Sequence, residues 1–251
     1  QQVTFDESGV EATQAQLRLM IAQGQALAQK YHAVVTNPPY MGASGMGDKL
    51  SRFVKDNYPD TKSDMSTVCM ERCLSLCNEQ GYMSMINIPV WMFLSSYEKL
   101  RYKIVANHTY INMVHPGRGI FGSDFGTTTF VIAKRHIIGY VGSYRRLFDE
   151  QGEVETNEVR EQAFLSGKGK YAAQQENFSK IPGAPVAYWV SPSIRAIFSG
   201  ERLGSHYEIR AGISSGDNAA FLRLWHEIDI TKSKIYSAEY MYTPHNKGGE
   251  Y

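Results

Sequence analysis

The segment His32-Ala33-Val34-Val35-Thr36-Asn37-Pro38-Pro39-Tyr40 decides how the rest of the chain is interpreted. Its first half is short, apolar and rich in β-branched residues, which predicts a buried strand that stops abruptly at two prolines. Proline fixes φ and lacks an amide proton, so the loop offers carbonyl acceptors without competing donors. Asn37 adds a side-chain acceptor and Tyr40 adds a flat aromatic face. This combination predicts a receptor for a planar group that carries an –NH2, with an ordinary strand-ending turn as the alternative.

The tetrapeptide Asn37-Pro38-Pro39-Tyr40 resembles the signature of the amino-group methyltransferases, which use S-adenosylmethionine. The resemblance implies that all four residues belong to the catalytic loop. The Asn37 side chain and the carbonyl of Pro38 would accept hydrogen bonds from the target amine, and Tyr40 would stack on its ring. Such acceptors draw the nitrogen lone pair out of conjugation and so favour the transition state over the ground state. The tetrapeptide alone leaves adenine, cytosine and glutamine amide open as the methyl acceptor.

Further strings narrow the resemblance to adenine-specific DNA methyltransferases of the PglX type, which act in BREX phage defence and have relatives among fused restriction–modification enzymes. The strings that carry this likeness are Met41-Gly42, Asn57-Tyr58-Pro59-Asp60, Met70-Glu71-Arg72, Trp91 to Arg101, Thr127 to Ile132, Gly212 to Asn218 and His245 to Glu250. They cover most of the chain. The implied substrate is the 6-amino group of an adenine flipped out of double-stranded DNA. The other implied partners are proteins of a defence system.

The same resemblance places further site residues. Phe121 lies where related enzymes have an aromatic residue that packs against the extruded base, so Tyr40 and Phe121 would hold the base together. Phe125 is the rival for that role. The segment before the next helix borders the adenine of the cofactor in this family, which implies cofactor contacts for Asp64 and Met65.

Composition sets broad limits on the protein. The 251 residues are 43% hydrophobic and 20% charged, which suits one globular α/β unit with a small second one. No apolar run approaches the ~20 residues that span a bilayer, so we expect no membrane partner. Three cysteines form no disulfide framework, which agrees with the cytoplasm. A DNA-binding protein with a net charge of +1 must gather its cations on one face. Lys134-Arg135-His136 and Arg145-Arg146 are candidates, with solvated strand ends as the alternative.

Hydrophobic periodicity predicts an α/β fold. Together with the resemblance, it indicates the second half of a methyltransferase-type (Rossmann-like) sheet, with helices on both faces and a mixed connector leading into a recognition region. The expected helices are 11–30, 63–78 and 93–106, with Ser63-Asp64 at the start of the second. The expected strands are 32–36, 82–88, 109–114, 127–133 and 140–148. The last three strands are expected to pair antiparallel at one edge.

Residues 1–149 are therefore expected to form a partial methyltransferase catalytic domain, and residues 150–251 a connector and the start of a target-recognition region. The catalytic loop comes 37 residues into a chain that begins at Gln1. We expect the glycine-rich cofactor turn, and the acid that follows it, to be encoded upstream, so that this fragment alone is inactive. Gly117 to Gly122 is assigned to a loop near the target base, with an ordinary edge turn as the alternative.

Cys69, Cys73 and Cys77 recur every four residues on the second expected helix. Sulfurs spaced in this way do not close tetrahedrally around one zinc, so we interpret them as small apolar core residues and expect no metal site. The family often has an aromatic residue at the position of Cys69, and this departure weakens a stacking role there.

Two other classes of function remain open. The tetrapeptide also serves amide methyltransferases that modify a protein glutamine, although the long extension after residue 150 argues against them. Alternatively, the chain is a non-catalytic DNA- or protein-binding fragment that needs a partner to supply the cofactor half. Cofactor binding by this chain, and methylation of DNA or a peptide by the full-length protein, would separate these classes.

Overall fold

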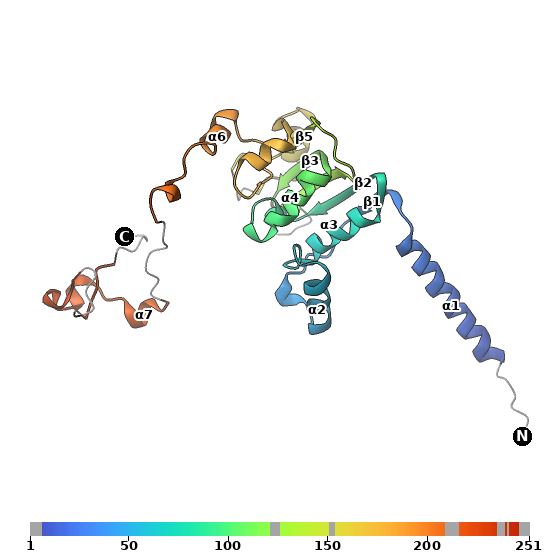
Figure 1. The fold of residues 1–251 in the computed structure, drawn as a ribbon, viewed down its shortest axis with the longest axis horizontal. Helices are drawn as coiled ribbons and strands as arrows, with labels where there is room; N and C mark the ends of the chain where they lie inside the picture. Colours follow the sequence, from blue (N-terminus) through green and yellow to red (C-terminus); the bar gives the residue numbers. More distant parts are fainter. Residues whose placement is uncertain are drawn as a thin grey trace, which may run out of the picture. The chain divides into compact units, whose positions relative to one another are not determined.

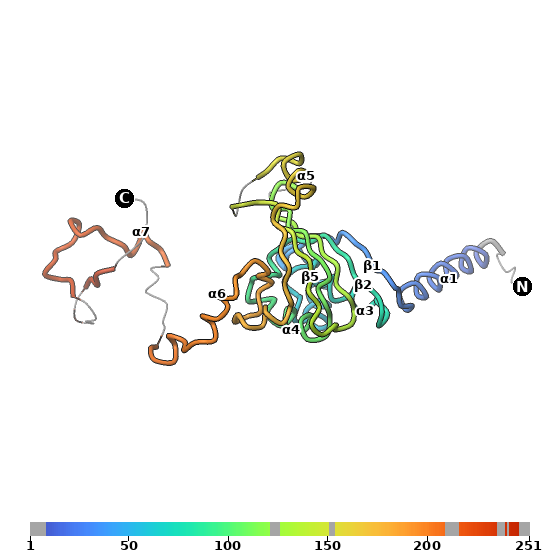
Figure 2. The backbone as a smooth tube through the Cα atoms, turned by 90° about the horizontal axis from the view of Figure 1, so that it is seen from above, coloured from blue at the N-terminus to red at the C-terminus, as the bar shows by residue number. Residues whose placement is uncertain are grey.

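The computed structural model describes residues 7–120, 126–150, 154–208, 216–234, 239 and 241–245. The chain divides into two compact units, residues 1–200 and residues 201–251. In the first unit, helices accompany a twisted sheet (Figures 1 and 2). In the described part of the second unit, 3-10 turns accompany one short helix, α7 (Asn218–Phe221).

A six-stranded mixed sheet is the centre of the first unit and confirms the expected α/β class. Its strands are β1 (Tyr31–Thr36), β2 (Cys77–Asn87), β3 (Thr109–Gly117), β4 (Thr127–Ala133), β5 (Val141–Arg146) and β6 (Lys170–Gln174). They lie in the order β1-β2-β4-β3-β5-β6. β1 is parallel to β2 and β3 is parallel to β5, whereas β4 is antiparallel to both of its neighbours. The carboxyl ends of β1, β2, β3 and β5 therefore meet at one edge, called here the carboxyl edge.

One face of the sheet carries the main hydrophobic core. The helices of the first unit, within the described residues, are α1 (Glu7–Ala28), α2 (Asp48–Asn57), α3 (Met65–Leu76), α4 (Glu98–Asn107), α5 (Asn157–Leu165) and α6 (Pro192–Ile197). Strand register aligns Met85, Phe130, Met113 and Tyr144 across four strands, and each is at most 1% exposed. Residues of α3 and α4 belong to the same core cluster. Among the described residues, no helix has the length and apolar character that crossing a bilayer requires.

β1 differs from the buried strand that its composition predicted. It stands at the end of the strand order, and the side chain of Val35 is 74% exposed. The register places Val35 in a row with Ser84, Val131 and Asn112, which are half-buried or exposed. An apolar run looks the same in a central strand and in a strand with one open side, so the sequence could not make this distinction.

β2 begins at Cys77 rather than at residue 82, because Gly81 lies inside the strand instead of ending the helix before it. A Cβ atom on Gly81 would lie 2.7 Å from the backbone oxygen of Tyr31. Glycine therefore lets the start of β1 approach β2 closely, which is a common use of glycine in strands.

The helix expected over 93–106 begins later, at Glu98, because two 3-10 turns, Pro89–Met92 and Ser95–Tyr97, precede it. Arg101 of α4 holds this segment. Its buried guanidinium donates hydrogen bonds to the carbonyl oxygens of Trp91 (2.9 Å), Leu94 (2.7 Å) and Gly183 (2.8 Å). A charged donor thus joins the two 3-10 turns to each other and to the chain near residue 183.

The strand pairing after residue 109 also corrects the sequence-based expectation. β3 and β4 are antiparallel as predicted, but β4 lies inside the sheet and β5 runs parallel to β3. The end of β5 therefore reaches the carboxyl edge. β6, in the stretch expected to be a connector, pairs with β5 and brings residues after 150 into the first unit. The expected division at residue 149 into catalytic and recognition parts stays a prediction.

Candidate active site

The loop Asn37 to Tyr40 leaves the end of β1 at the carboxyl edge. Asn37, Pro39 and Tyr40 are exposed, whereas Pro38 is buried and anchors the loop. The Tyr40 hydroxyl lies 3.0 Å from the side-chain oxygen of Asn37 and 3.3 Å from the carbonyl oxygen of Ile86 on β2. Partial burial raises the pKa of Tyr40, so its hydroxyl keeps the proton that it donates to these oxygens. The tyrosine therefore orients the Asn37 amide as well as presenting an aromatic face.

Backbone hydrogen bonds fasten the residues after this loop to the start of α3. The amide of Met65 donates to the carbonyl of Met41 at 2.9 Å, and the amide of Ala43 donates to the carbonyl of Ser63 at 3.0 Å. Asp64 is the N-cap of α3, as the sequence predicted, and its carboxylate accepts from the Ser66 amide at 2.8 Å. The segment from Asn37 to Ala43 is thus held between β1 and a capped helix, which limits its motion.

The two residues expected to contact the cofactor have clear structural surroundings. Asp64 is 7% exposed, and the same carboxylate oxygen that caps the helix also accepts from the Ser66 hydroxyl at 2.6 Å. Met65 is partly buried against a small apolar cluster that includes Met46 and Val54. These contacts position the start of α3, and a role in cofactor binding stays a prediction for both residues.

The cysteine stripe lies where its apolar interpretation placed it. Cys73 and Cys77 are buried in the main core, and Cys69 packs at its margin. Burial raises the pKa of Cys73 to about 11, with smaller contributions from the neighbouring thiols, so the group stays protonated at neutral pH. Within the part of the chain that the structure describes, no three His, Cys, Asp or Glu side chains come together as a metal site.

The expected base-stacking residue Phe121, and its rival Phe125, lie outside the described residues. The start of the connection that contains them is described. Gly117, at the end of β3, has φ +87°, and a Cβ atom there would lie 2.9 Å from the Phe148 ring. Arg160 of α5 donates to the carbonyl of Pro116 at 3.1 Å and also to the carbonyl of Arg118. The base of this connection is therefore fixed to the carboxyl edge.

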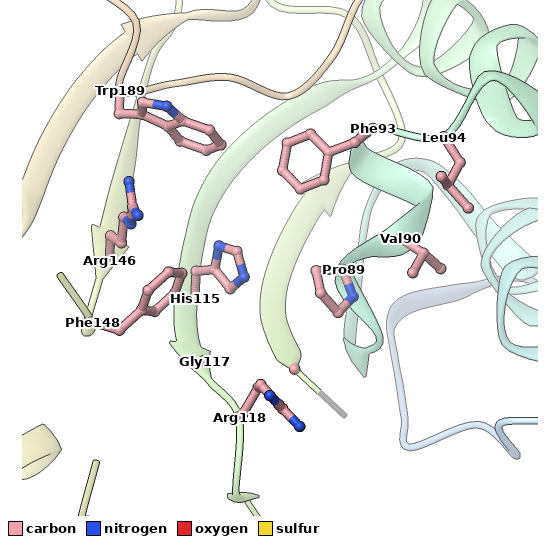
Figure 3. Close-up of a pocket in the computed structure, with 11 residues that line it drawn as sticks. Pro89, Val90, Phe93, Leu94, His115, Gly117, Arg118, Arg146, Phe148 and Trp189 are labelled. Carbon is pink, nitrogen blue, oxygen red and sulfur yellow. The ribbon is translucent and has the colours of Figure 1, made fainter. Parts of the chain in front are cut away.

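A cavity of about 630 Å³ opens beside this connection, between the turn after β2 and the ends of β3 and β5 (Figure 3). Its aromatic and charged walls are formed by Phe93, His115, Arg118, Arg146, Phe148 and Trp189. The volume lies within the range of pockets that hold small organic ligands.

Two arginines, Arg118 and Arg146, give the cavity a positive charge, and the histidine in its wall is neutral. The guanidinium of Arg146 lies 4.6 Å from the ring centre of Phe148 and 5.4 Å from that of Trp189. His115 is 7% exposed, and its Nδ1 atom has no hydrogen-bond partner among the described residues. Burial, together with the nearby charge of Arg146, lowers the pKa of His115 to about 4. The imidazole is therefore neutral at physiological pH.

Sequence reasoning assigned some of these residues to DNA or to the target base, but it did not bring them together in one cavity. Arg145-Arg146 was a candidate pair of cations for DNA, with a solvated strand end as the alternative. The meeting of the cavity residues depends on the parallel placement of β5 and on the return of the chain near residue 189, and neither is encoded in a local pattern.

Residues 5–121 match the Eco57I restriction-modification methylase family. Along its whole length the chain is 38% identical to the adenine-specific methyltransferase PglX of Lacticaseibacillus casei (strain Zhang), of which it covers 22%. It is 37% identical, over 94% of its length, to the adenine-specific methyltransferase BrxX of Escherichia coli O9:H4 (strain HS), of which it covers 20%. The chain thus spans about a fifth of these curated relatives, and the resemblance inferred from the sequence is confirmed.

A solved structure supports the fold alone. The cryo-EM structure of a DrdV–DNA complex is similar to this chain with a TM-score of 0.50 and 14% sequence identity. The likeness covers 70% of this chain and 20% of that one.

Proposed function

We propose that this chain, whose residues 5–121 match a restriction-modification methylase family, is the catalytic-loop portion of an adenine-specific DNA methyltransferase. The observation that carries the proposal is the exposed amide of Asn37 at the carboxyl edge, with the half-exposed Tyr40 ring beside it. The Tyr40 hydroxyl donates a hydrogen bond to the side-chain oxygen of Asn37. In open α/β sheets, ligands bind beyond the carboxyl ends of the strands. An acceptor and an aromatic face there suit a planar amine.

The proposed mechanism follows from these contacts. An adenine swings out of the duplex, and its 6-amino group donates hydrogen bonds to the Asn37 side-chain oxygen and the Pro38 carbonyl. Tyr40 stacks on the base while its hydroxyl keeps the Asn37 oxygen oriented. The amine then has a nitrogen lone pair directed at the incoming carbon. After the new N–C bond forms, the nitrogen is cationic and loses a proton to water, so no strong general base is needed.

S-adenosylmethionine would supply the methyl group from its sulfonium when the whole protein binds it. This chain shows no glycine-rich cofactor motif, so we place the main cofactor contacts in the rest of the protein. The backbone hydrogen bond from Met65 to Met41 puts Asp64 and Met65 next to the catalytic loop. It therefore supports the proposal that the start of α3 borders the bound cofactor. Phe121 remains our choice for the second aromatic face on the base.

The setting we propose is cytoplasmic phage defence or restriction–modification, with double-stranded DNA and other defence proteins as partners. The names of the PglX and BrxX relatives favour adenine over a protein glutamine as the methyl acceptor. A non-catalytic binding role for this chain alone remains compatible with a full-length enzyme that supplies the cofactor half.

The test uses the full-length protein with radiolabelled S-adenosylmethionine, offered double-stranded DNA in one reaction and a glutamine-containing peptide in another. We expect label on DNA and N6-methyladenine among its digested nucleosides, with transfer by Asn37→Ala slowed about 100- to 1000-fold. Transfer to the peptide, or label on cytosine, would overturn the proposal.

A further inference from the structure

The cavity beside Trp189 has the chemistry of a nucleotide site. Aromatic side chains form its walls, and the ring centres of Phe93 and Trp189 lie 5.7 Å apart at an angle of 60°. Bases stack on aromatic side chains without regard to sequence, because every base has a π face. Figure 3 shows His115, Phe148 and Phe93 around the same space, with Arg146 next to Trp189.

The charges of the cavity favour an anion. Arg118 and Arg146 line it, and no carboxylate does among the described residues. The Nε atom of Arg146 is buried without a hydrogen-bond partner in the described part of the chain. The Nδ1 atom of His115, another residue that lines the cavity, is likewise buried and unpartnered among the described residues. Because buried polar groups are normally paired, these two atoms point to a polar ligand that completes their bonding.

The cavity is distinct from the catalytic loop but lies on the same edge. None of the residues Asn37 to Tyr40 lines it. Its near wall is Pro89, three residues after Ile86, whose carbonyl lies 3.3 Å from the Tyr40 hydroxyl. Its far wall is formed by β5 and Trp189. A ligand here would therefore sit next to a base held at the loop.

We propose that this cavity binds one nucleotide of the DNA that flanks the target adenine, with its base packed on Phe93 and Trp189 and its phosphate held by Arg118 and Arg146. The cavity thus gives the enzyme a second binding site on the DNA strand, close to the extruded base. This inference rests on the proposed function, because that function supplies the DNA.

The test combines DNA duplexes that lack one base with a protein variant that lacks one aromatic ring. The methylated site of the full-length protein is first mapped, and duplexes are then made with one abasic residue at each flanking position in turn. For one position we expect the lesion to weaken binding by the wild type about 5- to 100-fold. In Phe93→Ala the same lesion should cost less than about twofold, because the stacking surface is already gone.

Phe164→Ala is the matched control. Phe164 is 45% exposed and Phe93 is 39% exposed, and Phe164 contacts Arg145 outside the cavity. This variant should keep the wild-type response to every lesion. Arg146→Gln is a second, independent variant, and the slope of its DNA affinity against salt should fall by about one phosphate contact.

The outcomes separate this inference from the function on which it rests. A protein that methylates DNA but shows equal lesion costs in the wild type and in Phe93→Ala overturns the nucleotide site alone. Displacement of DNA by free deoxyadenosine monophosphate in the wild type, lost in Phe93→Ala, with no flanking position coupled to Phe93, would assign the cavity to a free nucleotide instead. A full-length protein that binds no DNA overturns both proposals.

Discussion

The Asn37–Tyr40 loop and the cavity beside Trp189 share the carboxyl edge of one sheet, yet they present different chemical groups. The loop is four consecutive residues that expose an amide and a phenol; Tyr40 is hydrogen-bonded to β2, and Met41, the next residue, is hydrogen-bonded to α3. The cavity joins side chains from segments nearly 100 residues apart and presents aromatic rings and guanidinium groups. Oxygen acceptors at fixed positions suit one amine, whereas rings and cations suit a strand of DNA. We therefore propose that methyl transfer belongs to the loop and DNA binding to the cavity.

The largest effect should come from Asn37→Ala in the full-length protein. Removing one oriented hydrogen-bond partner of a transition state typically lowers the rate about 100- to 1000-fold. We expect this loss in the single-turnover methylation rate, with DNA affinity changed less than about tenfold if chemistry belongs to the loop. An equal loss in DNA affinity would remove the distinction between the two regions.

Arg101→Met should destabilise the turns that border the cavity more than it destabilises the Asn37–Tyr40 loop. The substitution leaves the carbonyls of Trp91, Leu94 and Gly183 without their charged donor, at a cost of about 3 kcal/mol of stability. Thermal unfolding of the full-length protein should show a lower midpoint for the transition that contains this unit. Arg72→Met, on the exposed side of α3, is the control, and an unchanged midpoint in Arg101→Met would show that the turn after β2 holds without it.

The cavity should also carry a pH dependence that the loop lacks. The pKa of His115 is lowered from 6.5 to about 4 in the folded protein, first by burial and then by Arg146. Unfolded chains take up this proton below pH 6.5 whereas folded chains refuse it until about pH 4, so stability falls as the pH drops through that window. We expect a loss on the order of 1–2 kcal/mol between pH 7 and pH 5.

His115→Phe keeps a ring against Phe148 and should remove this part of the acid sensitivity. Thermal midpoints at the two pH values measure the effect, and the same substitution at exposed His32 should leave the wild-type slope. A steeper loss in His115→Phe than in the wild type would contradict the assignment.

The smallest effect separates the two tasks of Tyr40. Tyr40→Phe keeps the stacking face but removes the hydroxyl that orients the Asn37 oxygen, and should lower the methylation rate about 5- to 10-fold. Tyr40→Ala also removes the ring and should lose more. Equal losses would mean that the hydroxyl alone matters, and no loss in Tyr40→Phe would mean that the ring alone does.

The loop was predictable because its information is contiguous. A β-branched run followed by two prolines defines the end of β1 and the exposed amide after it. The capping role of Asp64 is equally local, since an acid before a helical stretch accepts from the first turn. β4 was predicted with its observed bounds, Thr127–Ala133, because the stretch is made almost entirely of β-branched and aromatic residues, which favour strands.

The cavity and the strand order were less predictable because they depend on tertiary placement. Nothing near residue 141 specifies that β5 runs parallel to β3, and this choice alone brings Arg146 to the carboxyl edge. Glycine often follows the end of a helix, so Gly81 predicted a helix end before it. The close approach of Tyr31 instead requires a glycine inside β2. The delayed start of α4 reflects Arg101, whose partners at residue 183 lie far away in sequence.

The most direct measurement compares DNA affinity for the target adenine with affinity for purine, which lacks the 6-amino group, in wild-type full-length protein and in Asn37→Ala. If the Asn37 oxygen accepts a hydrogen bond from that group, the wild type should prefer adenine by about 5- to 10-fold and Asn37→Ala should bind both duplexes equally. An Asn37→Ala protein that keeps the full preference for adenine would contradict the account.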